Sequence, residues 1–283
     1  RSRFILFFLQ ADAVAARQLL ASDLARWGEH ICVQGTNGPI LILDRQKKES
    51  ARIYVVTHKE FVLPIAAPLY VPIWVGRQPR KNPDYLRDDT GDNISVLNPR
   101  LNECTALYWL WRNAGPVTYI GMVHYRRYFQ KERIEGPEHM LDEASVLQLL
   151  ENNDVLVAEE WLMSGSVQCQ LVNDLGEELF QCMNCKIEQL LAERQPDYLT
   201  AYHYVMAGYG FYRCNMFVTR WNIFDAYCQW LFSFIIDAAR EVDVCGQDVY
   251  HQRAAGFFAE RMLTVWLMRQ PLRIKELPIW EIK

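Results

Sequence analysis

The chain has 283 residues, of which 51% are hydrophobic and 23% are charged, and its formal net charge is −4. This is the composition of an ordinary globular protein, and the length suffices for one large domain with an appendage. The small negative charge excludes the broad basic field that holds a nucleic-acid backbone. We therefore expect no nucleic-acid partner.

Two features bear on the cellular compartment. The apolar run Phe4 to Leu9 is far shorter than the roughly 20 residues that a membrane-spanning helix needs, and no small-residue cleavage site follows it. The eight cysteines are scattered, and several lie inside apolar segments, as reduced core cysteines do. Both features predict a cytoplasmic protein.

Residues 1–50 differ in pattern from the rest of the chain. They predict a small α/β appendage with a strand at Phe4 to Leu9, a helix at Ala11 to Trp27, and two short apolar runs between Glu29 and Leu43. Because the first residue is not methionine, we interpret this appendage as the tail of a preceding domain. The polar stretch Asp44 to Ser50 is the expected linker.

Residues 51–283 form the predicted main domain, in which apolar strands alternate with amphipathic helices. Strands are expected at Ile53 to Val56, from Tyr119 onward, at Val155 to Ala158, at Met216 to Thr219 and at Leu272 to Leu277. Helices are expected at Asn98 to Asn113, Leu141 to Leu150, Gly176 to Glu193, Trp221 to Ala239 and Gly256 to Arg269. This alternation predicts an α/β fold with a mostly parallel central sheet flanked by helices.

The segment Tyr119 to Phe129 carries the clearest functional signal. It is an apolar run that ends in the sequence His-Tyr-Arg-Arg-Tyr-Phe, typical of a buried strand that delivers polar groups to the carboxyl edge of a sheet. If the strand continues, His124 and Arg126 share one face while Tyr125 and Arg127 take the other. Guanidinium groups there predict a phosphate or diphosphate ligand. The alternative is a strand end with solvated arginines and packed tyrosines.

A second polar group follows the first strand of the main domain. Thr57, His58 and Lys59 come directly after the β-branched run that ends at Val56. In mononucleotide-binding sheets, a base or a diphosphate lies at such a strand end. A solvated loop is the alternative.

The loop Asp88 to Pro99 is rich in Asp, Asn and Gly, which is typical of an ordered polar loop. Asp92, Asn93 and Ser95 are candidates to cap the following backbone or to hold ribose hydroxyls. Asp88, Asp89 and Asp92 are candidate ligands for Mg²⁺ or Mn²⁺, with a solvated turn as the alternative.

Two carboxylates are placed in the first turns of predicted helices. Glu103 opens one helix, where it complements the helix dipole or binds a sugar hydroxyl, and Glu260 lies near the start of the last helix. A helix end would keep Glu260 ionised and oriented as a general base. Asp248 is the alternative base.

Six motifs in this order resemble a family of bacterial capsular and exopolysaccharide-type glycosyltransferases, over Ile53 to Leu267. The motifs are Val55 to Lys59, Gly91 to Asn98, Glu103 to Asn113, Tyr119 to Phe129 (with His-Tyr-Arg-Arg-Tyr-Phe), Asn215 to Phe217, and Gly256 to Leu267. The resemblance implies a GT-A-like fold in residues 51–283 and a nucleotide-sugar donor, with UDP as the nucleotide and UDP-galactofuranose as one candidate. The family pattern has Cys and Leu where Asn102 and Cys104 stand, a change that we expect to affect packing.

The resemblance also suggests roles for the candidate residues. Glu260 would be the base, and His124 and Arg126 would stabilise the departing nucleoside diphosphate. The donor shell would consist of Thr57, His58, Lys59, Asp92, Asn93, Ser95, Glu103, Tyr125 and Arg127. The Asp-x-Asp metal motif common in GT-A enzymes is replaced by His124-Tyr125-Arg126, so protein cations would replace the metal. The alternative is a Mn²⁺ or Mg²⁺ ion held by His124 and the Asp88 loop.

The resemblance implies transfer of a hexose to a growing bacterial surface polysaccharide. The acceptor would be an oligosaccharide or a lipid-linked saccharide, and in the second case the enzyme would work at the inner face of the cytoplasmic membrane. Aromatic side chains between Trp161 and Tyr212 are candidates to stack against acceptor sugars.

The alternative function is a non-catalytic nucleotide-sugar-binding module of a larger enzyme. A phosphoester hydrolase that uses His124 is disfavoured, because no paired carboxylates or histidine-rich metal motif accompany it.

Overall fold

The computed structural model describes residues 31–33, 41–43, 50–65, 68–76, 79 and 82–282. The chain divides into two compact units, Arg1–Glu49 and Ser50–Lys283. In the first unit, strands β1 (Ile31–Val33) and β2 (Leu41–Leu43) pair in antiparallel fashion. The strand expected at Phe4 to Leu9 and the helix expected at Ala11 to Trp27 lie outside the described residues.

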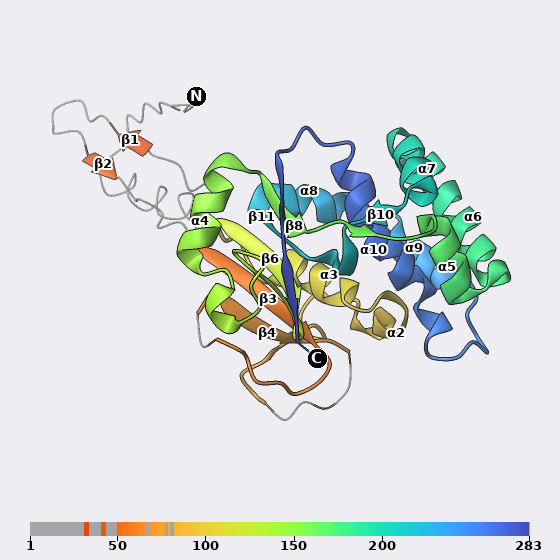
Figure 1. Cartoon of the computed structure of the whole chain (residues 1–283), viewed down its shortest axis with the longest axis horizontal. Helices are drawn as coiled ribbons and strands as arrows, with labels where there is room; N and C mark the ends of the chain where they lie inside the picture. Colours follow the sequence, from red (N-terminus) through yellow and green to blue (C-terminus); the bar gives the residue numbers. More distant parts are fainter. Residues whose placement is uncertain are drawn as a thin grey trace. The chain divides into compact units, whose positions relative to one another are not determined.

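Within the described residues of the second unit, nine strands form one sheet, in the order β12-β8-β11-β6-β3-β4-β5, with β7 and β13 attached beside β6 (Figure 1). The strands are β3 (Ala51–Thr57), β4 (Tyr70–Trp74), β5 (Leu86–Arg87), β6 (Tyr119–His124), β7 (Arg127–Phe129), β8 (Val155–Ala158), β11 (Phe217–Arg220), β12 (Ile274–Leu277) and β13 (Ile279–Glu281). Strands β6, β3, β4 and β5 are parallel, as are β12 and β8, whereas β11 runs antiparallel to both of its neighbours. The predicted mostly parallel sheet is confirmed.

Helices cover both faces of the sheet. They are α2 (Asn98–Leu101), α3 (Cys104–Asn113), α4 (Glu143–Asn152), α5 (Val167–Leu175), α6 (Glu177–Arg194), α7 (Leu199–Ala207), α8 (Trp221–Phe232), α9 (Ile235–Glu241) and α10 (Ala254–Leu267). The α/β class predicted from the sequence is therefore confirmed. Helices α5 and α7 were not among the predicted helices.

The central strands are buried on both sides because each face of the sheet packs against its own core. In β3, Tyr54 and Val56 join the core formed with α3, α8 and α10, while Ile53 and Val55 join the core formed with α4. Both faces therefore need apolar side chains, which explains why these strands are continuous apolar runs. Figure 1 shows α4 at one side of the sheet and α5 to α10 gathered at the other.

Two predicted helices are interrupted. The helix expected at Asn98 to Asn113 is divided into α2 and α3 at Asn102, which has the left-handed backbone angle φ 49°. The helix expected at Trp221 to Ala239 is divided into α8 and α9 by Ser233 and Phe234. The first break matters for function, because it directs the chain so that Glu103 lies at the start of α3.

Among the described residues, no helix combines the length and the apolar character that crossing a membrane requires.

Candidate functional site

Polar residues that follow two adjacent parallel strands meet at one edge of the sheet. Val56 of β3 pairs with His124 of β6, so the residues after Val56 lie next to the end of β6. The backbone N–H of Tyr125 donates to the carbonyl oxygen of Val56 at 3.1 Å, and the rings of His58 and Tyr125 meet edge to face at 5.6 Å. The two polar groups predicted from the sequence are therefore neighbours.

The end of β6 is a tight hairpin, and this corrects the expected alternation of side chains. His124 pairs with Arg127 across a turn formed by Tyr125 and Arg126. The strand does not continue through the turn, so the period of two that would place His124 and Arg126 on one face is interrupted. Arg126 instead extends from the turn, is exposed, and lies over the ring of Tyr125 at 5.1 Å.

A backbone segment that is distant in the sequence joins His124 to Glu260. Cys214 lies in the 3₁₀ turn Arg213–Asn215, immediately before β11. Its N–H donates to Oε1 of Glu260 at 2.5 Å, and its carbonyl oxygen lies 2.7 Å from Nε2 of His124. Because a carbonyl oxygen only accepts, Nε2 of His124 carries a proton. One peptide segment therefore holds both candidate catalytic side chains.

Glu260 has a second donor, and its position differs from the prediction. Helix α10 begins at Ala254, so Glu260 lies in the second turn of the helix, beyond the reach of the terminal N–H groups. The expectation that a helix end orients this carboxylate is wrong. The buried Arg261 donates to Oε2 of Glu260 at 2.6 Å, and together with the N–H of Cys214 it orients the carboxylate.

Asn215, the residue after Cys214, bonds to Glu103 and so holds it near His124 and Glu260. The side-chain amide of Asn215 donates to Oε1 of Glu103 at 2.9 Å. Burial raises the pKa of Glu103, and so does the nearby charge of Glu260, while the nearby His124 lowers it. The structure thus brings together Glu103, His124 and Glu260, which the sequence had selected separately.

The backbone is strained around these three side chains. Among the described residues other than glycine, only Asn102, Cys214 and Asn215 have positive φ angles, of 49°, 67° and 49°. Such angles cost energy in residues with a Cβ atom and tend to cluster at functional sites. All three residues border the site, and Oδ1 of the buried Asn215 is without a hydrogen-bond partner within the described part of the chain.

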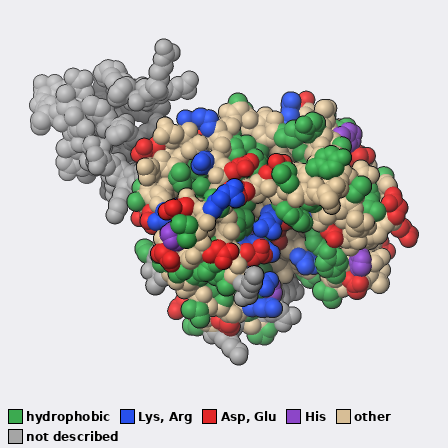
Figure 2. All heavy atoms as spheres, in the orientation of Figure 1, with side chains coloured by type: hydrophobic (Ala, Val, Ile, Leu, Met, Phe, Trp, Pro, Cys, Tyr) green, Lys and Arg blue, Asp and Glu red, His purple; other side chains and the backbone are tan. Residues whose placement is uncertain are grey.

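Basic side chains surround the outer side of this site, and we call His58, Lys59, His124, Arg126 and Arg253 the basic cluster. Burial lowers the pKa of His58, and the positive charges of the other four members lower it further. Each of these four groups is therefore close enough to His58 to disfavour its positive charge, and such a gathering of cations around one side chain favours binding of an anion. Figure 2 shows Lys and Arg side chains beside Asp and Glu side chains across the middle of one face.

Arg253 is a member of this cluster that sequence reasoning missed. It precedes α10, donates through Nε to Oδ1 of Asn102 at 2.9 Å, and lies 5.2 Å from the ring centre of Phe257. A lone arginine in a polar loop gives no signal in the sequence. The only hint in the sequence is that Arg253 comes seven residues before the candidate base Glu260.

Other residues of the expected donor shell, like Glu103, have partners inside the protein. Thr57 is buried, and its hydroxyl accepts from the N–H of Lys59 at 3.0 Å, which shapes the loop after β3. Arg127 donates to Glu281 of β13 at 2.9 Å. Tyr125 contacts both His58 and Arg126 and supports the basic cluster.

The loop Asp88 to Pro99 packs on α3 through its own contacts. Asp92 accepts from Arg112 at 2.7 Å and from the hydroxyl of Tyr108 at 3.1 Å. Asn93 accepts from both the N–H and the hydroxyl of Ser95. Of these bonds, only that from the Ser95 N–H to Asn93 caps the following backbone, because Asp92 accepts from side chains of α3.

The aspartates of this loop point to different partners. Asp88 accepts from Thr105 at 2.5 Å and from the N–H of Gly76 at 3.0 Å, and burial raises its pKa to about 6. Asp89 accepts from Arg87 at 2.7 Å. Within the described ranges, no three His, Cys, Asp or Glu side chains lie close enough to hold a metal ion. The Asp88 loop with His124 therefore does not fit a Mg²⁺ or Mn²⁺ site.

Asp248, the alternative base, caps the turn that leads to Arg253. Its carboxylate accepts from the N–H groups of Tyr250 and His251 and from the His251 ring at 2.8 Å. These bonds lower its pKa. Its side chain is largely exposed and serves the loop, whereas Glu260 is bound to the same peptide segment as His124.

Comparisons with known proteins agree with this fold. A solved apo structure of WbbM, described as a bifunctional glycosyltransferase, superimposes with a TM-score of 0.71 and 27% sequence identity. The match covers 83% of this chain but 45% of that one, so the chain spans about half the length of WbbM. No curated protein matches the chain. A family model matches residues 52–271, and the chain therefore belongs to the family described as Domain of unknown function (DUF4422).

Proposed function

We propose that residues 51–283 form a glycosyltransferase domain that moves a sugar from a nucleotide-sugar donor to a hydroxyl of a growing bacterial surface polysaccharide. The observation that carries this proposal is the convergence of Glu103, His124 and Glu260 on the segment Cys214–Asn215, beside the basic cluster. The likeness to WbbM, at 27% identity over 83% of this chain, supports the same reaction class.

The basic cluster is the proposed site of the donor diphosphate. Arg126 and Arg253 supply planar guanidinium groups, which suit phosphate oxygens, and His58 and Lys59 add donors from the adjacent strand end. The edge formed by the ends of parallel strands is also where open α/β sheets bind nucleotides. We propose a UDP-linked hexose as the donor, with UDP-galactofuranose as one candidate.

Glu260 is the proposed general base. As the acceptor oxygen forms its bond to the anomeric carbon, its proton passes to Glu260, and the bond from that carbon to the diphosphate oxygen breaks. The electron pair of the broken bond stays on the nucleoside diphosphate. Arg126, Arg253 and the ring of His124 stabilise this charge.

Glu103 is proposed to bind a hydroxyl of the donor sugar. Its pKa is raised by burial and by the charge of Glu260. Two carboxylates in one site whose surroundings differ in this way are suited to different tasks. Glu260, oriented by two donors, accepts a proton, while Glu103 holds the sugar in place with the help of Asn215.

The test is UDP release from a panel of UDP-sugars, together with calorimetric titration of the same donors. We expect at least one donor to bind and to release UDP when a saccharide acceptor is present. Binding of a donor without any release of UDP would indicate the non-catalytic module instead, and the absence of both would contradict the proposal. Activity should persist in excess EDTA, and complete loss that Mn²⁺ restores would contradict protein cations as the sole stabilisers.

A further inference from the structure

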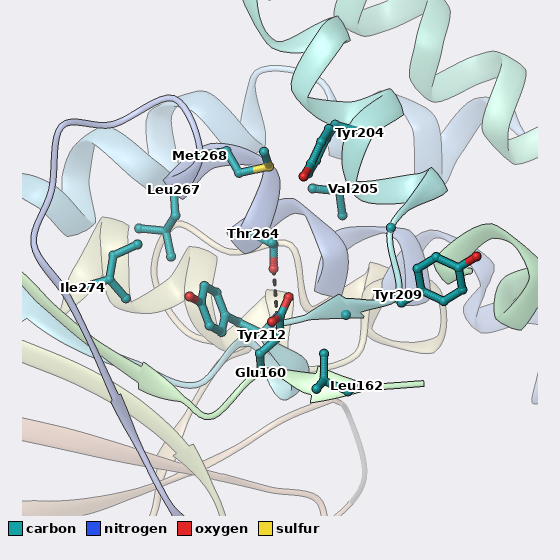
Figure 3. A pocket seen from close by; sticks show the side chains of 12 residues that line it. Glu160, Leu162, Tyr204, Val205, Tyr209, Tyr212, Thr264, Leu267, Met268 and Ile274 are labelled. Carbon is teal, nitrogen blue, oxygen red and sulfur yellow. Dashed lines mark hydrogen bonds between the residues drawn. The ribbon is translucent and has the colours of Figure 1, made fainter. Parts of the chain in front are cut away.

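A hollow next to the site is lined by exposed tyrosines, and we call it the tyrosine pocket. Its cavity volume is about 410 Å³, which lies within the range of roughly 300–1,000 Å³ typical of small-molecule sites. Figure 3 shows Tyr204 of α7 and Thr264 of α10 directed toward the same space, with Glu160 beside Tyr212. Tyr209 lies at the rim of the pocket, and its ring points away from Thr264.

The two outer tyrosines are unusually exposed for aromatic residues. Tyr204 is 69% exposed and Tyr209 is 62% exposed. Leu162 and Met268, which also line the pocket, are exposed as well. Flat aromatic rings with hydroxyl groups at their edge can stack against the C–H face of a sugar while they hydrogen-bond to its hydroxyls.

The carboxylate of Glu160 in the pocket, with Glu276 bonded to the lining residue Tyr212, gives this region the opposite charge to the basic cluster. Glu160 lines the pocket, and it packs so closely on Gly210 that a Cβ atom there would come within 2.7 Å of its carboxylate. The hydroxyl of Tyr212 donates to Glu276 at 3.0 Å. Burial raises the pKa of Tyr212, and the charges of Glu276 and Glu160 raise it further. This acidic lining disfavours a diphosphate and suits a neutral polyhydroxylated ligand.

The pocket and Glu260 are connected through the segment Tyr212–Cys214, which bonds to α10 at two points. The N–H of Tyr212 donates to the Thr264 hydroxyl at 2.9 Å, and two residues later the N–H of Cys214 donates to Glu260 at 2.5 Å. Glu260 and Thr264 are four residues apart on one helix face, a separation of about 6 Å along the axis. Thr264, which lines the pocket, is therefore about one helical turn from the proposed base.

We propose that the tyrosine pocket binds the acceptor, a neutral saccharide, and presents its hydroxyl to Glu260. This proposal rests on the proposed glycosyl transfer. The acceptor ring stacks on Tyr204 and contacts Tyr209 at the rim of the pocket, Glu160 accepts from its hydroxyls, and the apolar wall formed by Leu267 and Ile274 contacts its C–H groups.

Saturation-transfer NMR tests this without relying on turnover. The probes are lactose, maltose, methyl α-mannopyranoside, both methyl galactopyranosides and methyl β-galactofuranoside. We expect at least one to receive saturation from the wild-type chain, and we expect its Kd to rise about tenfold in Tyr204→Ala and in Tyr209→Ala. The control Ile134→Ala removes an exposed apolar side chain between β7 and α4 and should leave binding unchanged.

Calorimetry with UDP separates the failure of this proposal from the failure of the proposed function. Both tyrosine variants should bind UDP as the wild type does. If the wild type binds UDP but none of the saccharides, or if saccharide binding survives in the Tyr204→Ala/Tyr209→Ala double variant, the acceptor pocket is wrong while the transferase proposal stands. Saccharide binding with no uptake of any UDP-sugar would instead contradict the proposed function.

Discussion

The basic cluster and the tyrosine pocket are both next to helix α10 in the sequence or in space, and they differ in almost everything else. Arg253 comes just before α10, Glu260 lies in its second turn, and Thr264 reaches the pocket one turn later. The cluster is positive and lies mostly at strand ends, whereas the pocket contains the carboxylate of Glu160 and exposed aromatic rings and is lined by residues of α7, α10 and the neighbouring strands and loops. Under our proposals, this difference directs a charged donor and a neutral acceptor to opposite sides of Glu260.

The largest effect should come from removing the base between the two regions. Glu260→Gln keeps an oxygen that can accept from the N–H of Cys214, but it cannot take a proton. We expect transfer to fall by about 10²–10⁴-fold while calorimetry shows unchanged donor binding. Asp248→Asn is the matched control. Normal turnover in Glu260→Gln, with loss in Asp248→Asn, would move the base to Asp248.

Removing a guanidinium group should affect the two regions differently. Arg126→Ala and Arg253→Ala should each weaken UDP binding by about 10- to 100-fold, as expected for charge-assisted hydrogen bonds. Saccharide binding in the tyrosine pocket should not change. Arg133→Ala is the control, since this exposed arginine pairs with Glu159. Unaltered UDP affinity in both cluster variants would rule out a diphosphate there.

The start of helix α10 packs closely against the break between α2 and α3, and this close packing depends on Gly256. A Cβ atom on Gly256 would come 2.3 Å from Nδ2 of Asn102 and 3.2 Å from the Arg100 carbonyl oxygen. We therefore expect Gly256→Ala to lower the free energy of unfolding by about 1–3 kcal/mol and to impair both binding sites. In Gly165→Ala the nearest atom would be 3.6 Å away, so this control should be tolerated. Equal urea midpoints for the two variants would refute the close approach.

The smallest expected effect is a pH dependence confined to the basic cluster. Burial and neighbouring cations hold the pKa of His58 below 6.5 in the free protein. A bound diphosphate favours the protonated ring and raises this pKa, so binding takes up a proton and affinity falls as the pH rises through the pKa of the complex.

Calorimetry with a UDP-sugar between about pH 5 and pH 8, in buffers of different ionisation enthalpy, measures this uptake. We expect the affinity to change by about threefold to tenfold, and His58→Gln should abolish the dependence. Saccharide binding in the tyrosine pocket should be independent of pH over the same range. A pH-independent donor affinity in the wild-type chain would place the diphosphate away from His58.

Local patterns predicted most helices and the strands β3, β6, β8, β11 and β12, but they missed β4, β5, β7 and β13 of the same sheet. The buried run Val155 to Ala158 was predicted with the bounds that β8 has, because four apolar residues between turn signals favour a buried strand. The break at Asn102 could not be predicted in this way. A left-handed Asn costs energy locally, and the contacts of Asn102 with Arg253 and Gly256 come from residues more than 150 positions away.

The sequence by itself determined the α/β fold class and singled out His124, Glu103 and Glu260, because apolar periodicity and unusual polar side chains are visible one residue at a time. Only the tertiary structure decided that Cys214 and Asn215 connect these three side chains and that Arg253 joins the basic cluster. The link through Cys214 is made by a peptide N–H and a carbonyl oxygen. Almost every residue carries these backbone groups, so folding alone decides which of them meet a catalytic side chain.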